Sequence, residues 1–294
     1  MTVGDRHIDL HLHSTASDGT LSPTELVARA VALGLSAIAL TDHDSIGGLA
    51  AAAVACRAAG IELVTGVELS ADVPKGTCHV LGYYVDPQDP AFGAWLEERR
   101  RARVDRGQEI VRRVNGALRD RLGAGAPQAT WEGVARRANL AEGGAVGRPH
   151  VADELIAVGA ITSRDEAFAT LLGDGMPGDV PSTKLGPEEV IDVIRRAGGV
   201  AVLAHPTYLP GYEARLPALV EAGLGGLECV YGEYSAEVIA HLKEVAGQHG
   251  LVVTGGSDFH GPELGAGSGE MGVPAVPASL LGPLAALRPL SARR

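Results

Sequence analysis

Short aliphatic runs and amphipathic stretches take turns along the first part of the chain. The run at 8–13, "IDLHLH", has a period of two, which predicts a strand with aliphatic side chains on one face and His11 and His13 on the other. The stretch that follows, "SPTELVARAVALG", has helical spacing, an N-terminal capping box and a final glycine, so we expect a helix. This strand and helix rhythm continues to residue 86 and returns after residue 186. It predicts about seven strands in a parallel sheet, either open and doubly wound or closed as a barrel.

The pattern changes between residues 87 and 184, where strand patterns stop and arginine-rich helical segments take their place. Residues 97–121 hold nine arginines against five acidic residues. We interpret 87–184 as a helical subdomain inserted into a unit made by residues 1–86 and 185–261, with 262–294 as a Gly- and Pro-rich tail. Five arginines of the first inserted helix are interpreted as a solvated face rather than a substrate groove: Arg99, Arg100, Arg101, Arg103 and Arg106.

Composition and charge narrow the classes of protein. With 46% hydrophobic and 21% charged residues the chain is typical of a globular protein. No apolar run reaches the roughly 20 residues that a bilayer span needs, and no basic region precedes an apolar stretch at the start, so we expect a cytoplasmic protein without a membrane segment. A formal net charge of −11 argues against stable binding of duplex DNA. The three cysteines are too scattered for a disulfide framework.

Histidines and carboxylates gather where the predicted strands end. In parallel α/β architectures these ends converge on one crevice, so we expect the side chains to meet. Imidazole and carboxylate ligands without a thiolate suit Zn, Mn or Fe. Two or three divalent ions that share a bridging carboxylate would use the whole set, and clustered ions clamp the attacking and leaving oxygens of a phosphoryl transfer. The candidate ligands are His11, His13, Asp18, His43, Glu68, His79, His205, Asp258 and His260.

Six motifs in chain order carry a resemblance to a known family. They are "DLHLHSTASDGT", "ALTDHD", "GVELS", "HVLGY", "VLAHP" and "GSDFHG", and they span Asp9 to Gly261. Together they resemble the polymerase and histidinol phosphatase (PHP) family of metal-dependent phosphoesterases. The resemblance implies a distorted (β/α)7 barrel with a site for three metal ions. It implies that His11, His13, Glu68 and Asp258 hold one ion, that Glu68 bridges to a second ion held by His79 and His205, and that Asp18, His43 and His260 hold the third.

A further motif in the insertion bears on the substrate. The segment "GRPHVA", 147–152, is similar to that of the small bacterial nucleotide phosphatases of this family. The similarity implies removal of the 3′-phosphate from nucleoside 3′,5′-bisphosphates, with 5′-to-3′ exonuclease activity on short RNA in some members. Arg148 and His150 are then candidates to grip a second phosphate, because the arginine fork matches phosphate oxygens, and Lys184 is a weaker candidate.

Two acidic residues, Asp42 and Asp44, flank His43 and are candidates to orient it or to move protons. Tyr234 is a departure, since a histidine is expected there in related phosphatases. Three alternatives stay open: a phosphatase of another metabolite such as histidinol phosphate, an amidohydrolase-type barrel that also begins with His-x-His, and a non-catalytic metal or RNA-binding module. The complete ligand set weighs against the last of these, and the sequence leaves the oligomeric state open.

Overall fold

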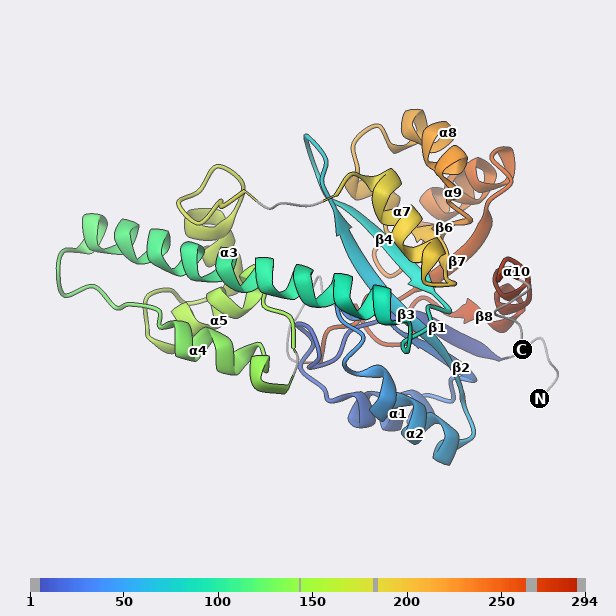
Figure 1. Ribbon diagram of the computed structural model, residues 1–294, viewed down its shortest axis with the longest axis horizontal. Helices are drawn as coiled ribbons and strands as arrows, with labels where there is room; N and C mark the ends of the chain where they lie inside the picture. The colour runs from blue at the N-terminus through green and yellow to red at the C-terminus, as the bar shows by residue number, and fades with distance from the viewer. Residues whose placement is uncertain (1–5, 143, 182–184, 263–268, 290–294) are drawn as a thin grey trace.

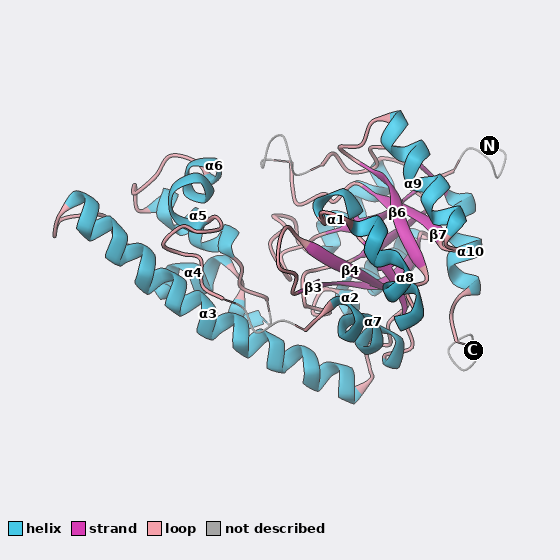
Figure 2. Cartoon of the chain, turned by 90° about the horizontal axis from the view of Figure 1, so that it is seen from above, coloured by secondary structure: helices cyan, strands magenta, loops and turns pink. Residues whose placement is uncertain are grey.

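The computed structural model describes residues 6–142, 144–181, 185–262 and 269–289. The chain forms a barrel-like body surrounded by helices, from which a long helix and a cluster of shorter ones project to one side (Figure 1). Seen from above, the far half of the long helix carries the shorter helices along its flank (Figure 2). Among the described helices, none is both long enough and apolar enough to cross a membrane.

A single mixed sheet forms the body, with strand order β7-β6-β5-β4-β3-β2-β1-β8. The sheet is nearly closed, because Leu12 at the end of β1 bridges to Phe259 just after β7, and the His13 N–H donates to the Phe259 carbonyl at 3.0 Å. This confirms the distorted barrel. The strands are β1 (His7–Leu12), β2 (Ala37–Leu40), β3 (Glu62–Ala71), β4 (Cys78–Tyr83), β5 (Val200–Leu203), β6 (Gly226–Tyr231), β7 (Val252–Gly256) and β8 (Val276–Pro277).

Two strands run against the expectation of a wholly parallel sheet, the short edge strand β8, which is antiparallel to β1, and β4. β4 forms a hairpin with β3, with Ser70 opposite His79, and it is also antiparallel to β5. Hydrophobic periodicity carries no information on strand direction, which explains the difference. The reversal has a consequence for the site, because the beginning of β4 lies at the edge where the parallel strands end. His79, the second residue of β4, therefore reaches the same crevice as residues that follow the other strands.

Close packing between β1 and β7 depends on one glycine. A Cβ atom on Gly256 would lie 2.3 Å from the Cβ of His11, far inside contact distance. Only glycine allows the backbones to approach this closely, so Gly256 lets the barrel close beside its first histidine.

Helices cover the outside of the barrel (Figure 1). The first begins with the predicted capping box, in which the Ser22 side chain accepts from the Glu25 N–H while Glu25 accepts from the Ser22 N–H. The barrel helices are α1 (Pro23–Ala32), α2 (Leu49–Ala59), α7 (Pro187–Arg196), α8 (Tyr212–Ala222), α9 (Ala236–Gln248) and α10 (Leu281–Ala286).

The projecting part has a hydrophobic core of its own. Its largest element is α3 (Pro90–Leu122), a helix of 33 residues whose Val114 and Leu118 are buried against the shorter helices. Those are α4 (Trp131–Arg137), α5 (Arg148–Ala157), α6 (Arg164–Ala167) and a π-helical turn at Phe168–Leu172. The first turns of α3 pack elsewhere, since Phe92 and Leu96 belong to the core of the barrel body. Helix α3 therefore joins two cores.

The C-terminal segment, whose sequence is rich in Gly and Pro and shows no clear period, packs against the barrel. Val276 in β8 pairs with Ile8 in an antiparallel bridge to β1, and Leu284 in α10 is fully buried. The Gly272 N–H donates to the buried Asp9 carboxylate at 2.8 Å. Residues 269–289 therefore add an edge strand and a covering helix to the barrel. Both elements are too short to produce a visible period in the sequence.

Candidate metal centre

The nine candidate ligands come together at one end of the barrel, around the buried carboxylate of Glu68. Oε1 of Glu68 lies 2.7 Å from His79 Nδ1 and 3.1 Å from His205 Nε2. Oε2 lies between 3.1 and 3.2 Å from a ring nitrogen of each of three further histidines, His11, His13 and His43. One carboxylate thus faces five imidazoles, which is the arrangement expected of a bridging ligand.

Three groups of ligand atoms are each compact enough to surround one ion, with all their atoms within 4.8 Å of one another. The first, His11, His13, Glu68 and Asp258, is the set that the family resemblance implies for one ion. The second adds His13 to the implied set of Asp18, His43 and His260, and the third joins His43 and His79 to Glu68. His205, implied with His79, approaches the same oxygen of Glu68 as His79 does.

Several donor atoms at this site are buried without a hydrogen bond among the described residues. They include both ring nitrogens of His13, Nδ1 of His43, Nδ1 of His205 and Oδ1 of Asp18. Buried polar atoms are almost always satisfied, so orphaned imidazole nitrogens and a carboxylate oxygen in one place fit residues that bind cations. The donor set therefore fits divalent metal ions.

The electrostatics of the cluster support the same interpretation. Burial would raise the pKa of Glu68, but His43, His79 and His11 hold it well below its usual range. Burial, helped by the neighbouring His13 and His79, lowers the pKa of His43 to about 3, although Glu68 and Asp18 act in the opposite direction. Ionised carboxylates thus face at least one imidazole that stays neutral. Metal ions need both forms, because they bind carboxylates and deprotonated imidazoles.

A buried carboxylate that the sequence reasoning missed orients two of the ligands. Oε1 of Glu228 lies 2.9 Å from His11 Nδ1, and Oε2 accepts the backbone N–H of His205 at 2.7 Å. His11 can donate its Nδ1–H to Glu228, which leaves Nε2, on the side of Glu68, as the nitrogen that would bind a metal ion. The signal was an acidic residue inside the aliphatic run "GGLECV", which a strand buried on both faces does not otherwise accommodate.

A tyrosine orients another ligand in the same way. The Tyr231 hydroxyl donates to Oδ2 of Asp258 at 2.8 Å. The other oxygen of Asp258, Oδ1, is then left to face His11 at 3.3 Å and His13 at 3.1 Å. Tyr234, the departure in the sequence, has its ring 5.0 Å from that of Tyr231 and accepts a hydrogen bond from the Thr207 hydroxyl at 2.9 Å.

Three non-glycine residues at the site have left-handed backbones, with φ of 47° at Asp44, 25° at His205 and 54° at Asp258. Such conformations cost free energy, and they persist where the surrounding structure determines them. Each lies directly after a strand or a strand-like bridge, where the turn directs a ligand or its neighbour into the crevice.

The two acidic residues that flank His43 have different partners. Asp42 is buried and accepts hydrogen bonds from the Ser14 N–H at 2.7 Å and from the hydroxyls of Ser14 and Ser17 at 2.8 and 2.7 Å. These bonds hold the loop after β1, which carries Asp18. Asp44 instead forms an ion pair with Arg103 of α3. Among the contacts of the described residues, neither carboxylate hydrogen-bonds to the His43 ring, which we expected them to orient.

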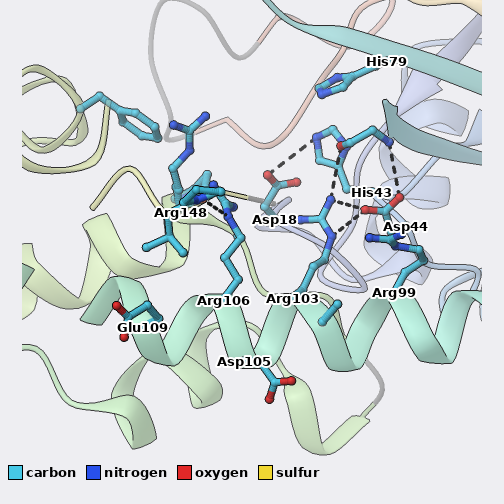
Figure 3. A pocket seen from close by; sticks show the side chains of 17 residues that line it. Asp18, His43, Asp44, His79, Arg99, Arg103, Asp105, Arg106, Glu109 and Arg148 are labelled. Atoms are coloured by element: carbon cyan, nitrogen blue, oxygen red, sulfur yellow. Dashed lines mark hydrogen bonds and ion pairs between the residues drawn. The ribbon is translucent and has the colours of Figure 1, made fainter. Parts of the chain in front are cut away.

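A cavity of about 540 Å³ opens beside the cluster and has two chemically different ends (Figure 3). Asp18, His43 and His79 line one end. Four arginines lie along the rest of the lining, Arg99, Arg103 and Arg106 from α3 and Arg148 from the start of α5, together with Asp44, Asp105 and Glu109. The α3 arginines recur at spacings of four and three residues, so they share one helical face. The interpretation of this face as merely solvated was therefore wrong for three of the five arginines.

The other two arginines do match that interpretation. Nε of Arg100 donates to Glu97 at 2.8 Å, and the side chain of Arg101 is 69% exposed. Counting arginines could not separate the two groups, but helical spacing could have, because 99, 103 and 106 fall on one face and 100 and 101 do not.

The arginine end gathers like charges around the cavity. Burial, together with the neighbouring Arg148 and Arg103, lowers the pKa of Arg106 to about 10, although Asp179 acts in the opposite direction. Arg148 donates to the Leu172 carbonyl at 3.0 Å and lies over the Phe168 ring at 5.7 Å, which holds its guanidinium at the cavity wall. Guanidinium groups placed close together repel one another, and an anion bound between them offsets this repulsion. This end of the cavity is therefore suited to a phosphate.

His150, expected beside Arg148 as a phosphate ligand, has another place. Its Nδ1 accepts the Gly147 N–H at 3.0 Å and its Nε2 donates to the Ser17 carbonyl at 3.1 Å, so both ring nitrogens are used. Burial lowers the pKa of His150, which matches this neutral form. His150 ties α5 to the loop after β1 and is absent from the lining of the cavity. Lys184 lies outside the described residues.

Comparison with known proteins agrees with this geometry. The PHP domain family matches residues 9–112. The 3′,5′-nucleoside bisphosphate phosphatase of Chromobacterium violaceum is 35% identical over 263 residues, which cover 88% of this chain and 89% of that protein. The 5′-3′ exoribonuclease Rnm of Escherichia coli is 36% identical over 260 residues, 86% of this chain and 85% of that one. A crystal structure from Bifidobacterium adolescentis, inferred to be a metal-dependent phosphoesterase, superposes with a TM-score of 0.84 at 31% identity and covers 98% of this chain and 99% of its own.

The barrel and its cluster of imidazoles and carboxylates define a hydrolase of phosphate esters. The chain belongs to the PHP family. This confirms the resemblance that the six sequence motifs carry.

Proposed function

We propose that this protein removes the 3′-phosphate from nucleoside 3′,5′-bisphosphates. The observation that carries the proposal is one cavity that has candidate metal ligands at one end and arginines at the other. A substrate with two phosphates matches both ends, because one phosphate can lie among the ligands while the other pairs with guanidinium groups. The bisphosphate phosphatase of Chromobacterium violaceum supports the same substrate class.

Two or three divalent ions, Mn, Fe or Zn, would be held by the nine ligands, with Glu68 shared between them. Such ions supply Lewis acidity that activates water and offsets charge on the phosphoryl oxygens. The chain itself positions the reacting groups. Glu228 and Tyr231 orient His11 and Asp258, and the Asp42 network holds the loop that carries Asp18.

Arg106 and Arg148 would bind the second phosphate, the 5′-phosphate of the nucleotide. This contact lies away from the reacting phosphorus, so its role is to bind the substrate and to orient it. A metabolite with one phosphate and no second anion, such as histidinol phosphate, leaves this end of the cavity without a partner. The arginine end thus favours a bisphosphate over that alternative.

Short RNA with a 5′-phosphate presents the same two groups, a terminal phosphate and a phosphodiester at the 3′ position of the first nucleotide. We include it as a second substrate class, supported by the 36% identity to the exoribonuclease of Escherichia coli. Cleavage of that diester would release a mononucleotide in place of inorganic phosphate.

A substrate panel tests the proposal. The Mn-reconstituted protein is incubated with adenosine 3′,5′-bisphosphate, AMP, histidinol phosphate and a 5′-phosphorylated oligoribonucleotide, and release of phosphate and mononucleotide is measured. We expect the bisphosphate to have the highest kcat/KM for phosphate release. Turnover of histidinol phosphate alone would overturn the proposal.

A further inference from the structure

An ion pair spans the cavity wall between the metal-ligand end and the arginine end. Asp44 follows the ligand His43, and its Oδ2 accepts from Nε of Arg103 on α3 at 2.6 Å and also pairs with a terminal guanidinium nitrogen. In Figure 3 Arg103 points from the helix toward Asp44 and His43, whereas Arg106, one turn further along, points toward Arg148. The pair therefore connects the helix that carries the anion-binding arginines to the loop that carries a metal ligand.

Further hydrogen bonds tie the pair to two other segments. Arg103 donates to the Ser70 hydroxyl at 3.4 Å and to the Val146 carbonyl at 3.3 Å, just before α5. The Ser70 N–H in turn donates to Oδ1 of Asp44 at 3.4 Å. Ser70 lies two residues after the bridging Glu68 on β3. One guanidinium thus joins α3, the β2 loop, β3 and the entrance to α5.

The pair is also well sheltered. The Asp44 side chain is 8% exposed and that of Arg103 is 21% exposed. Ion pairs of two exposed long side chains contribute little to geometry, but a largely buried carboxylate with several donors has few alternative positions. The backbone of Asp44 is left-handed, with φ 47°, and its carboxylate accepts from Arg103 on α3.

We propose that Asp44 and Arg103 are positioning residues that set the separation between the metal-ligand end and the Arg106 and Arg148 end of the cavity. This inference rests on the proposed function, because it concerns how that site selects a substrate with two phosphates. Arg106 follows Arg103 by three residues, about 4.5 Å along the helix axis, so fixing Arg103 fixes where Arg106 can bind an anion. The pair makes the enzyme selective for substrates whose two phosphates have that separation.

A proton-transfer role for Asp44 would have a different signature. A carboxylate that moves a proton at the reacting phosphate affects every substrate equally, with or without a second phosphate. A positioning pair affects mainly the substrate that uses both ends of the cavity. The ratio of kcat/KM for adenosine 3′,5′-bisphosphate to that for adenosine 3′-monophosphate separates these roles.

The experiment measures this ratio for the Mn-reconstituted wild type, Asp44→Asn, Arg103→Gln and the double variant. We expect each single variant to lower the ratio by about tenfold or more, mainly through a higher KM for the bisphosphate, and to lower kcat/KM for the monophosphate by about twofold to threefold. The double variant should resemble the single variants, because residues that act as a pair are not additive. Arg101→Gln is the matched control on the outer face of α3 and should leave the ratio unchanged.

Three outcomes are decisive. If the wild type shows no preference for the bisphosphate, the proposed function fails and this inference fails with it. If the wild type prefers the bisphosphate but the variants lose both substrates equally, or keep the ratio, only the positioning role is overturned. Metal content and the thermal unfolding midpoint are measured for each variant, and an altered ratio at unchanged metal content supports the proposal.

Discussion

The carboxylate of Glu228 lies 2.9 Å from Nδ1 of His11, on the side of the imidazole ring opposite Glu68. Neither residue is exposed, and the pair lies at the base of the site. Glu228 therefore fixes which ring nitrogen of His11 is available as a ligand.

We expect Glu228→Gln to weaken metal binding by about tenfold to a hundredfold, because the uncharged amide neither holds the Nδ1 proton as strongly nor raises ligand basicity. Competition with a chelator, followed by analysis of bound metal, measures the change. Glu244→Gln, on the exposed surface of α9, is the matched control. Equal metal affinity in the wild type and in Glu228→Gln would contradict this role.

His11→Ala should remove most of the activity and lower the number of metal ions that copurify. His11 faces both Glu68 and Asp258, so its loss opens the first ligand group directly. Metal content by elemental analysis and phosphate release are measured on the same sample. Full activity in this variant would refute the ligand assignment.

Arg106→Gln should raise KM for adenosine 3′,5′-bisphosphate by about tenfold with a smaller change in kcat, since a charge-assisted hydrogen bond contributes roughly 1.5–3 kcal/mol. The expected control is Arg100→Gln, which lies on the same helix but pairs with Glu97. Steady-state kinetics with both variants provide the comparison. An unchanged KM in Arg106→Gln would remove Arg106 from the binding site.

Glu154 predicts a pH dependence of stability in the projecting helices. Burial would raise the pKa of Glu154, but the Thr130 hydroxyl and Arg137 lower it. A lowered carboxyl pKa stabilises the fold above the unfolded value of about 4.3, and this stabilisation is lost as the pH falls through the folded value.

We therefore expect Glu154→Gln to lower the free energy of unfolding by about 1 kcal/mol at pH 7, with a smaller difference from the wild type at pH 3.5. Urea unfolding at both pH values, in the presence of a chelator, measures it. The exposed Glu132 on α4 offers the control Glu132→Gln. A difference that grows on acidification would show that the sign is wrong.

The cluster of candidate ligands was accessible from the sequence because its members lie in short-range patterns. Alternation in "IDLHLH" separates the buried Leu10 and Leu12 from His11 and His13, and the remaining ligands lie in motifs at strand ends or, for His79, at a strand start. The direction of β4 was not accessible, because a strand has the same period whichever way it runs. The edge strand β8 is only two residues long and has no period at all.

The contacts that hold the candidate site residues in place were harder to predict, because they depend on which side chains meet across the fold. Glu228 meets His11 across 217 positions in the chain, and Asp44 meets Arg103 across 59. Nothing near His150 in the sequence indicates that its ring would be taken up by Gly147 and Ser17. Short motifs identify the residues that carry chemistry, whereas the residues that hold them in place are set by tertiary structure.

The anchoring of helix α3 in two hydrophobic cores affects how the cavity is held. Its first turns are anchored through Phe92 and Leu96 in the barrel, and its later turns through Val114 and Leu118 in the projecting helices. The stretch between, 97–113, contains no proline, and its one glycine, Gly107, is buried in the helix beside the Trp131 ring. Helix α3 runs unbroken from one core to the other, so the side of the cavity that its arginines line is attached to both the barrel and the projecting helices.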